Sequence, residues 1–473
     1  MKYLSFIPKT EVKISKIGFY AGLLVGTLFL FFIAIRYAYE WIWIIFPPVL
    51  VMVFLLASDD IVIGLLFVAI YETITDNFLD TDPSMYIGPL NVYLSDVVWI
   101  FFLGVFLYRV FKTKFVNIAN TSSGRWFILF FSWVIIGAIS GSSIYAQSAL
   151  GDARRFLSML CIAIYCASFT LDDRTIKNIS KVLVFFVIFH VLLAVLRWAG
   201  IVQMPWYVDE FGGEDLWAYR AVDEMKTFYM LSMVAVVFIL MKTGLIKRRL
   251  YLYLFMLSLL IMVVIMQHRS VWVSAIVMIL FFLLFFFSVR GQIYGLIAVS
   301  VVVFVLIKFK LTFTASGGLG NTIYTSMISS WEDPNSTAMW RIANWLGLLE
   351  NMTLRDYIIG TKFGTYFPGR YIMAEEINVY TSPHNFFVRI MYKLGSIGLF
   401  IFIVLQAILM KKLWRIGKQV KSDLHKSMGL IMFSILIGLN AMFLSYEPAI
   451  DYGIFLGLSI AFVQRKEFRL VYA

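Results

Sequence analysis

Hydrophobic runs of about 15–25 residues recur along the whole chain, and they limit the fold more than any other feature. An apolar α-helix crosses a bilayer because it satisfies its own backbone hydrogen bonds where no water is available. The 473 residues are 61% hydrophobic and only 14% charged, a balance that a soluble core does not explain. We therefore expect an all-α polytopic membrane protein.

The runs predict about 14 transmembrane helices, with 12–14 as the range. The third run is the shortest, and the ninth and tenth form a tight pair. The expected spans are 17–36, 41–57, 60–74, 93–111, 126–143, 154–170, 180–199, 226–243, 249–267, 271–289, 292–309, 386–410, 427–445 and 448–464.

The net charge of +12 indicates orientation rather than nucleic-acid binding. Lysine and arginine gather in the short gaps between alternate runs, as the positive-inside rule requires. With fourteen spans, these gaps and both termini fall on the cytoplasmic side. We expect a multi-pass membrane protein that has no nucleic-acid partner.

The longest connection between runs, residues 310–384, then lies outside. Apolar residues recur at helical spacing around Trp340 and Trp345, which predicts an amphipathic helix on the membrane surface. Three parts follow: a helix bundle over 1–309 (spans 1–11), a periplasmic loop subdomain over 310–384, and C-terminal spans over 385–473 (spans 12–14).

A histidine stands where this loop meets the twelfth span. Ser382 suits an N-cap and Pro383 suits the first helical position, so we expect His384 in the first helical turn. The positive end of a helix favours neutral imidazole, which can accept a proton. Gly395 and Gly398 would then lie below it, on a strip where another helix or a lipid chain packs closely.

Several basic residues are expected on the outer face, against the general trend. An arginine between two spans is expensive unless it binds something, and its guanidinium matches phosphate oxygens. Salt bridging or interfacial anchoring is the alternative for each of them. These residues are Arg154, Arg155, Arg220, His268, Arg269 and Arg341.

The spacing of His384-Asn385, Gly395 and Gly398 resembles the histidine signature of the O-antigen ligases. The related O-antigen and exopolysaccharide polymerases share that signature more loosely. Arg269 also opens a segment similar to the Ser-Arg-Gly type of this superfamily, although His268 and Ser270 replace the usual serine and glycine.

Two further positions extend the resemblance. Arg341 precedes the histidine by an interval typical of the family's second essential arginine, and Asp96 looks like its early-span aspartate. The resemblance is specific over residues 260–410.

The resemblance implies a GT-C-like membrane glycosyltransferase whose active site is periplasmic. Its donor would be a glycan on undecaprenyl diphosphate, and it would need no metal, nucleotide or other cofactor. His384 would be the catalytic base, and Arg269 and Arg341 would bind the donor diphosphate. The further candidates for substrate binding are Arg220, Arg155, His268 and Asn385.

Several functions stay open. A polymerase of O-antigen or exopolysaccharide would use a glycan acceptor, whereas an O-antigen ligase would transfer the glycan to lipid A core in lipopolysaccharide. The alternatives outside this class are a flippase of the same lipid-linked glycan and a non-catalytic assembly partner. Membrane lipid and polysaccharide chain-length or export proteins are candidate partners.

Overall fold

The protein is described by a computed structural model. It describes residues 53, 56–78, 84–87, 90–113, 117–145, 147–202, 221–266, 268–286, 288–290, 293, 337–365, 367, 383–447, 450–465 and 468. The spans expected at 17–36 and 292–309, and nearly all of 41–57, lie outside the described residues.

The chain divides into two compact units, residues 1–83 and 84–473. In the first unit, helix α3 (Ile61–Phe78) coincides with the expected third span. Everything described below belongs to the second unit.

In the second unit, a helix coincides with each expected span that falls on described residues. Among the described residues of this unit, six helices are long and apolar enough to cross a membrane: α4 (Leu94–Thr113), α5 (Ser122–Tyr145), α7 (Asp173–Trp198), α9 (Glu224–Lys242), α17 (Phe386–Gln419) and α18 (Asp423–Met442). Shorter or more polar helices are α6 (Gln147–Ala167), α10 (Leu250–Ile265), α11 (Arg269–Phe286) and α19 (Ile450–Val463). The protein is therefore a predominantly helical multi-pass membrane protein.

Smaller elements connect these helices. An antiparallel hairpin of β1 (Ser84–Ile87) and β2 (Leu90–Tyr93) precedes α4, which an all-α expectation does not include. A 3₁₀ turn, η1 (Asn117–Asn120), precedes α5. The helix predicted around Trp340 and Trp345 is confirmed as α15 (Thr337–Glu350), and α16 (Leu354–Ile359) follows it.

Side-chain caps explain where several of these helices begin. The side chains of Asp172, Asp223 and Ser422 accept hydrogen bonds from backbone N–H groups in the first turns of α7, α9 and α18. Each cap satisfies a donor that has no partner within its own helix. The apolar runs fix the length of the helices, and these polar residues fix their starts.

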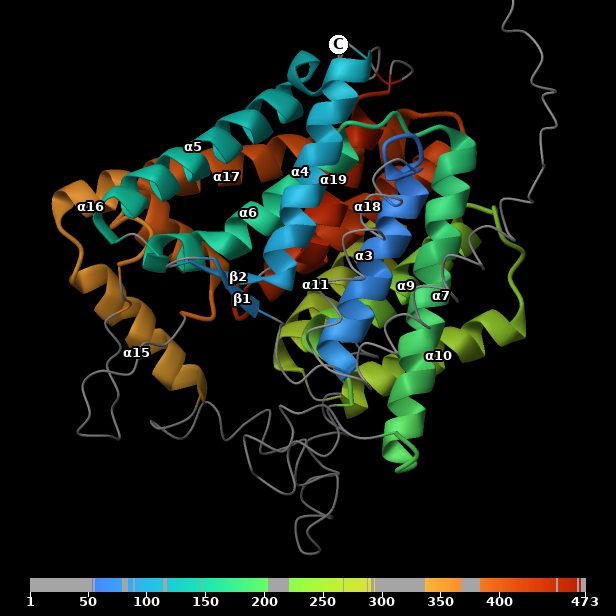
Figure 1. Cartoon of the computed structure of the whole chain (residues 1–473). Helices are drawn as coiled ribbons and strands as arrows, with labels where there is room; N and C mark the ends of the chain where they lie inside the picture. The colour runs from blue at the N-terminus through green and yellow to red at the C-terminus, as the bar shows by residue number, and fades with distance from the viewer. Residues whose placement is uncertain are drawn as a thin grey trace, which may run out of the picture. The chain divides into compact units, whose positions relative to one another are not determined.

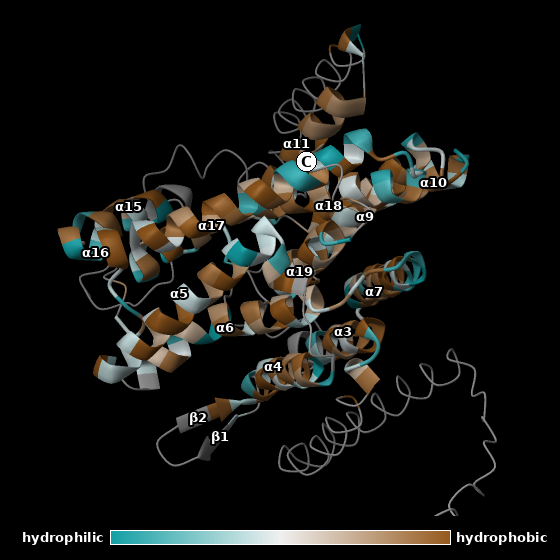
Figure 2. Ribbon diagram, turned by 90° about the horizontal axis from the view of Figure 1, so that it is seen from above, coloured by the Kyte–Doolittle hydropathy of each residue, from teal (hydrophilic) through white to brown (hydrophobic). Residues whose placement is uncertain are grey.

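Helices that are distant in sequence lie side by side (Figure 1). Helix α6 contacts α4, α5 and α19, and α17 contacts α5 and α18. Phe102, Phe156, Phe402 and Tyr452 are fully buried between these helices. Figure 2 shows hydrophobic residues along most of the helices, and many of them are exposed, as expected for surfaces that face lipid.

Two groups of polar contacts join the helix ends. Arg155 of α6 and Arg389 of α17 both pair with Glu447, which lies between α18 and α19. At the other end of α18, His425 pairs with Asp173 of α7. The two groups therefore lie at opposite ends of the bundle, as alternating spans require. The side of the membrane on which each group lies stays a prediction.

Helix α17 begins three residues later than the cap signals in the sequence indicate. The side chain of Asn385 accepts a hydrogen bond from Val388 N at 3.1 Å, so Asn385 is the N-cap and Phe386 the first helical residue. The prediction that His384 lies in the first turn is wrong. His384 precedes the cap and has a φ of +48°, a left-handed conformation that few residues other than glycine adopt.

The helix is also interrupted at Gly395, whose φ of +70° and ψ of −175° are not helical. A Cβ atom at Gly395 would lie 2.3 Å from Ile358 O, and one at Gly398 would lie 3.2 Å from the Trp133 ring. Because of the break, the two glycines do not form a continuous helical strip below His384. Protein from α5, α16 and the residue after α16 packs against them.

Candidate active site

A cavity of about 490 Å³ opens at the end of the bundle that holds Glu447. Four segments form its walls: the start of α4, the first half of α6, the residue before the α17 cap, and the connection between α18 and α19. The lining residues are Ser95, Arg154, Arg155, Ser158, His384, Tyr446, Glu447 and Ile450.

The carboxylate of Glu447 organises one wall of the cavity. Its Oε2 accepts a hydrogen bond from Arg155 Nη1 at 2.7 Å and another from Arg389 Nη1. Glu447 and Arg389 are buried, whereas the side chain of Arg155 is 62% exposed. Arg155 is thus held in place by Glu447 and still reaches a ligand in the cavity.

Behind this wall lies a buried ionic network that positions Arg389. Asp152 Oδ1 accepts a hydrogen bond from Arg389 Nη2 at 2.8 Å, and its Oδ2 lies 2.5 Å from Lys393 Nζ. Lys393 also donates to Thr365 O, and Gly364 N donates to Asp152 at 3.1 Å. The network ties the segment after α16 to α6 and α17.

The opposite wall is fixed by a second ion pair. Arg154 Nε lies 2.5 Å from Asp96 Oδ1, and the guanidinium lies 4.4 Å from the centre of the Tyr93 ring. Asp96 also accepts hydrogen bonds from Trp99 Nε1 and Tyr93 N, each at 3.0 Å. The aspartate singled out in the sequence therefore positions Arg154 at the cavity.

His384 is held by hydrogen bonds of its chain neighbours on both sides. Trp345 Nε1 of α15 donates to Pro383 O at 2.5 Å. Asn385 Nδ2 donates to Leu444 O at 3.1 Å. The left-handed backbone of His384 thus lies between the loop helix α15 and the turn after α18, and its exposed ring lines the cavity.

Electrostatics favour the neutral form of His384. Partial loss of water around the ring lowers its pKa below the usual value, and the positive charge of Arg341 lowers it further. The negative charge of Glu447 acts in the opposite direction. At neutral pH the imidazole therefore carries no charge and has a nitrogen available to accept a proton.

Arg341 reaches this site from α15. Its Nη1 donates to Ser445 O at 3.2 Å, next to the cavity residues Tyr446 and Glu447. The loop helix therefore places a positive charge within electrostatic range of His384. The structure brings together four basic residues that the sequence singled out: Arg154, Arg155, Arg341 and His384.

The other residues predicted for the site do not line the cavity or lie outside what the structure describes. His268 is buried, with Nε2 2.8 Å from Val222 O, and it does not line the cavity. Asn385 caps α17. Arg220 lies outside the described residues, and for Arg269 the structure describes only the backbone, at the first residue of α11.

Sequence reasoning missed Asp152, Arg389, Lys393 and Glu447. A signal was present, because Arg389 and Lys393 lie one turn apart inside an otherwise apolar run. Ionisable residues within membrane spans are rare and mark paired or functional positions. The sequence does not reveal that they pair with Asp152 and Glu447, since those partners lie in other helices and turns.

The helices and this cavity define a multi-pass membrane protein with a histidine and several arginines at one end. Residues 253–403 match the family model described as O-antigen ligase. The match confirms the resemblance of this segment to the O-antigen ligase and polymerase superfamily, a glycosyltransferase-like class of membrane enzymes. A search of curated proteins found no match.

Proposed function

We propose that the protein is a GT-C-like glycosyltransferase that lengthens a glycan carried on undecaprenyl diphosphate at the periplasmic face of the inner membrane. The observation that carries this proposal is that a neutral His384 and the guanidinium of Arg155 line one cavity, beside Arg341. A base next to fixed positive charges suits a reaction in which a hydroxyl attacks and a diphosphate leaves.

In the proposed step, His384 accepts the proton of an acceptor hydroxyl as its oxygen bonds to the anomeric carbon of the donor. The bond from that carbon to the diphosphate oxygen breaks, and the electron pair leaves with the lipid diphosphate. Arg269 and Arg341 are proposed to bind this diphosphate, with Arg155 as a further contact. Donors that are already in place stabilise the developing charge without reorganisation.

A ligase that transfers the glycan to lipid A core is the second candidate, favoured by the description of the matched family. The chemistry at the donor is the same, and only the acceptor differs. The spacing of His384, Gly395 and Gly398 also favours the ligase, whereas the divergence from the superfamily pattern around Arg269, where His268 and Ser270 replace the usual residues, favours the polymerase.

Purified protein in lipid, supplied with its host's undecaprenyl-diphosphate-linked oligosaccharide and a chelator, tests the proposal. A polymerase is expected to give a ladder of products without added nucleotide or metal. A single shift that requires lipid A core would establish the ligase instead. Movement of the lipid across the bilayer without a new glycosidic bond would refute both and indicate a flippase.

The acid side of the pH profile is expected to follow the ionisation of His384. The base works only when neutral, so kcat/KM should rise as pH rises through its pKa, which lies below the usual imidazole value. Arg341→Gln removes a charge that lowers this pKa, so the midpoint should move to higher pH. Glu447→Gln removes a charge that raises it, so the midpoint should move to lower pH.

Transfer rates measured across the acid range check this prediction, with both variants first shown to be folded. A purely structural role of the two residues would lower the rate without moving the midpoint. Shifts of both variants in the same direction would contradict the assignment of His384 as the base.

A further inference from the structure

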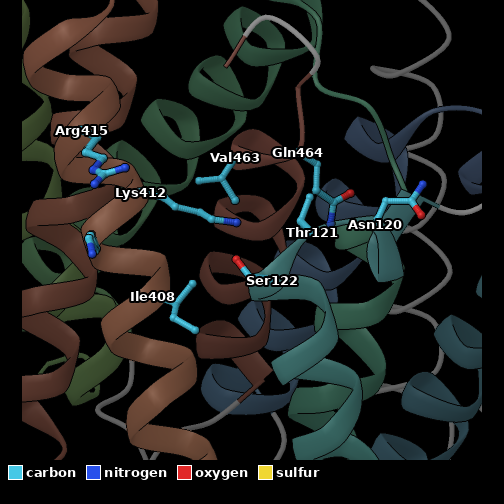
Figure 3. A pocket seen from close by; sticks show the side chains of 9 residues that line it. Asn120, Thr121, Ser122, Ile408, Lys412, Arg415, Val463 and Gln464 are labelled. Atoms are coloured by element: carbon cyan, nitrogen blue, oxygen red, sulfur yellow. The ribbon is translucent and has the colours of Figure 1, made fainter. Parts of the chain in front are cut away.

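A second cavity, of about 700 Å³, lies at the opposite end of the bundle from the candidate active site. It is bounded by the start of α5, the last turns of α17 and the end of α19 (Figure 3). At about 1.5 Å per residue, Lys412 lies roughly 25 Å along α17 from the break at Gly395, and the two cavities share no lining residue. The two cavities are therefore separate sites.

Positive charge dominates this second cavity. Lys411, Lys412 and Arg415 are among its nine lining residues, and no lining residue is acidic. Figure 3 shows the Lys412 side chain extending between Val463 and Ser122, and its Nζ lies 3.3 Å from Ser123 Oγ. Cations gathered around one space repel each other unless an anion lies between them.

The wall opposite α17 supplies hydrogen-bond donors. Thr121 and Ser122 stand at the start of α5, where the helix dipole presents its positive end. Gln464 completes this wall, and its buried Nε2 has no hydrogen-bond partner among the described residues. This unpaired donor belongs to the lining of the same cavity and is independent of the basic residues.

Apolar side chains complete the cavity. Ile408, one turn deeper than Lys412 on α17, lies on the side of the cavity toward the interior of the bundle, and the buried Val463 lies on the other side of the Lys412 side chain. A group bound here would thus meet cations and amide or hydroxyl donors at one end and hydrocarbon at the other. A phosphodiester attached to acyl chains has this combination of chemistry.

We propose that this cavity is a binding site for a phosphate group, supplied by the headgroup of an anionic membrane lipid. The site is distinct from the catalytic cavity, and its occupancy does not depend on the transferase reaction. The alternative source of the same chemistry is free inorganic phosphate.

The test is native mass spectrometry of the purified full-length chain titrated with phosphatidylglycerol, with phosphatidylcholine as the zwitterionic control and inorganic phosphate as competitor. We expect phosphatidylglycerol to bind at least about 10-fold more tightly than phosphatidylcholine. Lys412→Gln and Arg415→Gln should each raise the dissociation constant about 10-fold, since each removes a charge-assisted contact.

Two further variants make the result specific. Lys421→Gln removes the same charge just beyond α17, outside the cavity lining, and should change the dissociation constant by less than about 2-fold. Ser122→Asp places an anion in the cavity wall while favouring the start of α5, so binding should be lost although thermal stability is kept.

Each outcome decides the proposal. Loss of binding in the cavity variants alone supports the lipid site, and equal binding of inorganic phosphate with the same variant pattern assigns the site to free phosphate. An equal loss of lipid binding in Lys421→Gln would show that the basic surface attracts the lipid in general and that the cavity is not a specific site. Unchanged binding in Lys412→Gln, Arg415→Gln and Ser122→Asp would overturn the proposal.

Discussion

Replacing His384 with alanine is expected to reduce glycan transfer by about 10²–10⁴-fold, the range typical of losing a general base. The ring lines the cavity beside Arg155 and Glu447. Partial loss of water around the ring and the charge of Arg341 keep its pKa low, so the neutral base is the form present. The substitution removes an exposed side chain, so the thermal stability of the protein should stay close to that of the parent.

The matched control is His425→Gln at the opposite end of the bundle. His425 Nε2 lies 2.9 Å from Asp173 Oδ1, and glutamine keeps a donor for that carboxylate. This variant should retain the parental rate of transfer. A His384→Ala protein that transfers glycan at the parental rate would remove His384 as the base, and an equal loss in both variants would trace the effect to the fold.

Gly395→Ala is expected to lower the free energy of unfolding of the protein by about 3 kcal/mol or more. The backbone of Gly395 has a φ of +70° and a ψ of −175°, a region essentially closed to other residues. The added Cβ would lie 2.3 Å from Ile358 O and 2.5 Å from Gly360 N. Backbone atoms cannot rotate away as a side chain can, so α16 must shift from α17.

Thermal unfolding in detergent measures this effect, with Gly151→Ala in α6 as the control. A Cβ at Gly151 meets nothing within 4 Å, and alanine suits a helix interior better than glycine by about 0.5–1 kcal/mol. Gly151→Ala should therefore leave stability unchanged or raise it slightly. Equal stability of the two variants would show that α17 is not fixed in this broken form.

The helices could be predicted because each apolar run carries its own reason to be helical. The start of α17 could not, since Ser382-Pro383 and Asn385 are competing cap signals within four residues. The break at Gly395 was hidden for a different reason. A glycine inside an apolar helix is found both where helices pack closely and where a helix is broken. Which of the two applies depends on the backbone of Ile358 and Gly360, which belongs to another segment and occupies the space beside Gly395.

The residues of the candidate site also divide into those that the sequence could predict and those that it could not. Motif spacing and an unusual position between spans identified His384, Arg155 and Arg341. Glu447 and Asp152 stood out in no pattern, because their role is pairwise and their partners are remote: Arg155 and Glu447 are 292 residues apart in sequence, and Arg389 and Asp152 are 237 apart. The hairpin before α4 is too short to produce a strand period within a polar connection.

The ion pairs of Glu447 form late in synthesis, because both partners, Arg155 and Arg389, precede Glu447 in sequence. Arg155 emerges from the ribosome roughly 15–60 s before Glu447 at ordinary rates of synthesis. During that interval one wall of the candidate active site lacks its central carboxylate, and Arg389 lacks one of its two acidic partners. The wall that holds Arg155 is therefore completed only when the last helical hairpin has been made.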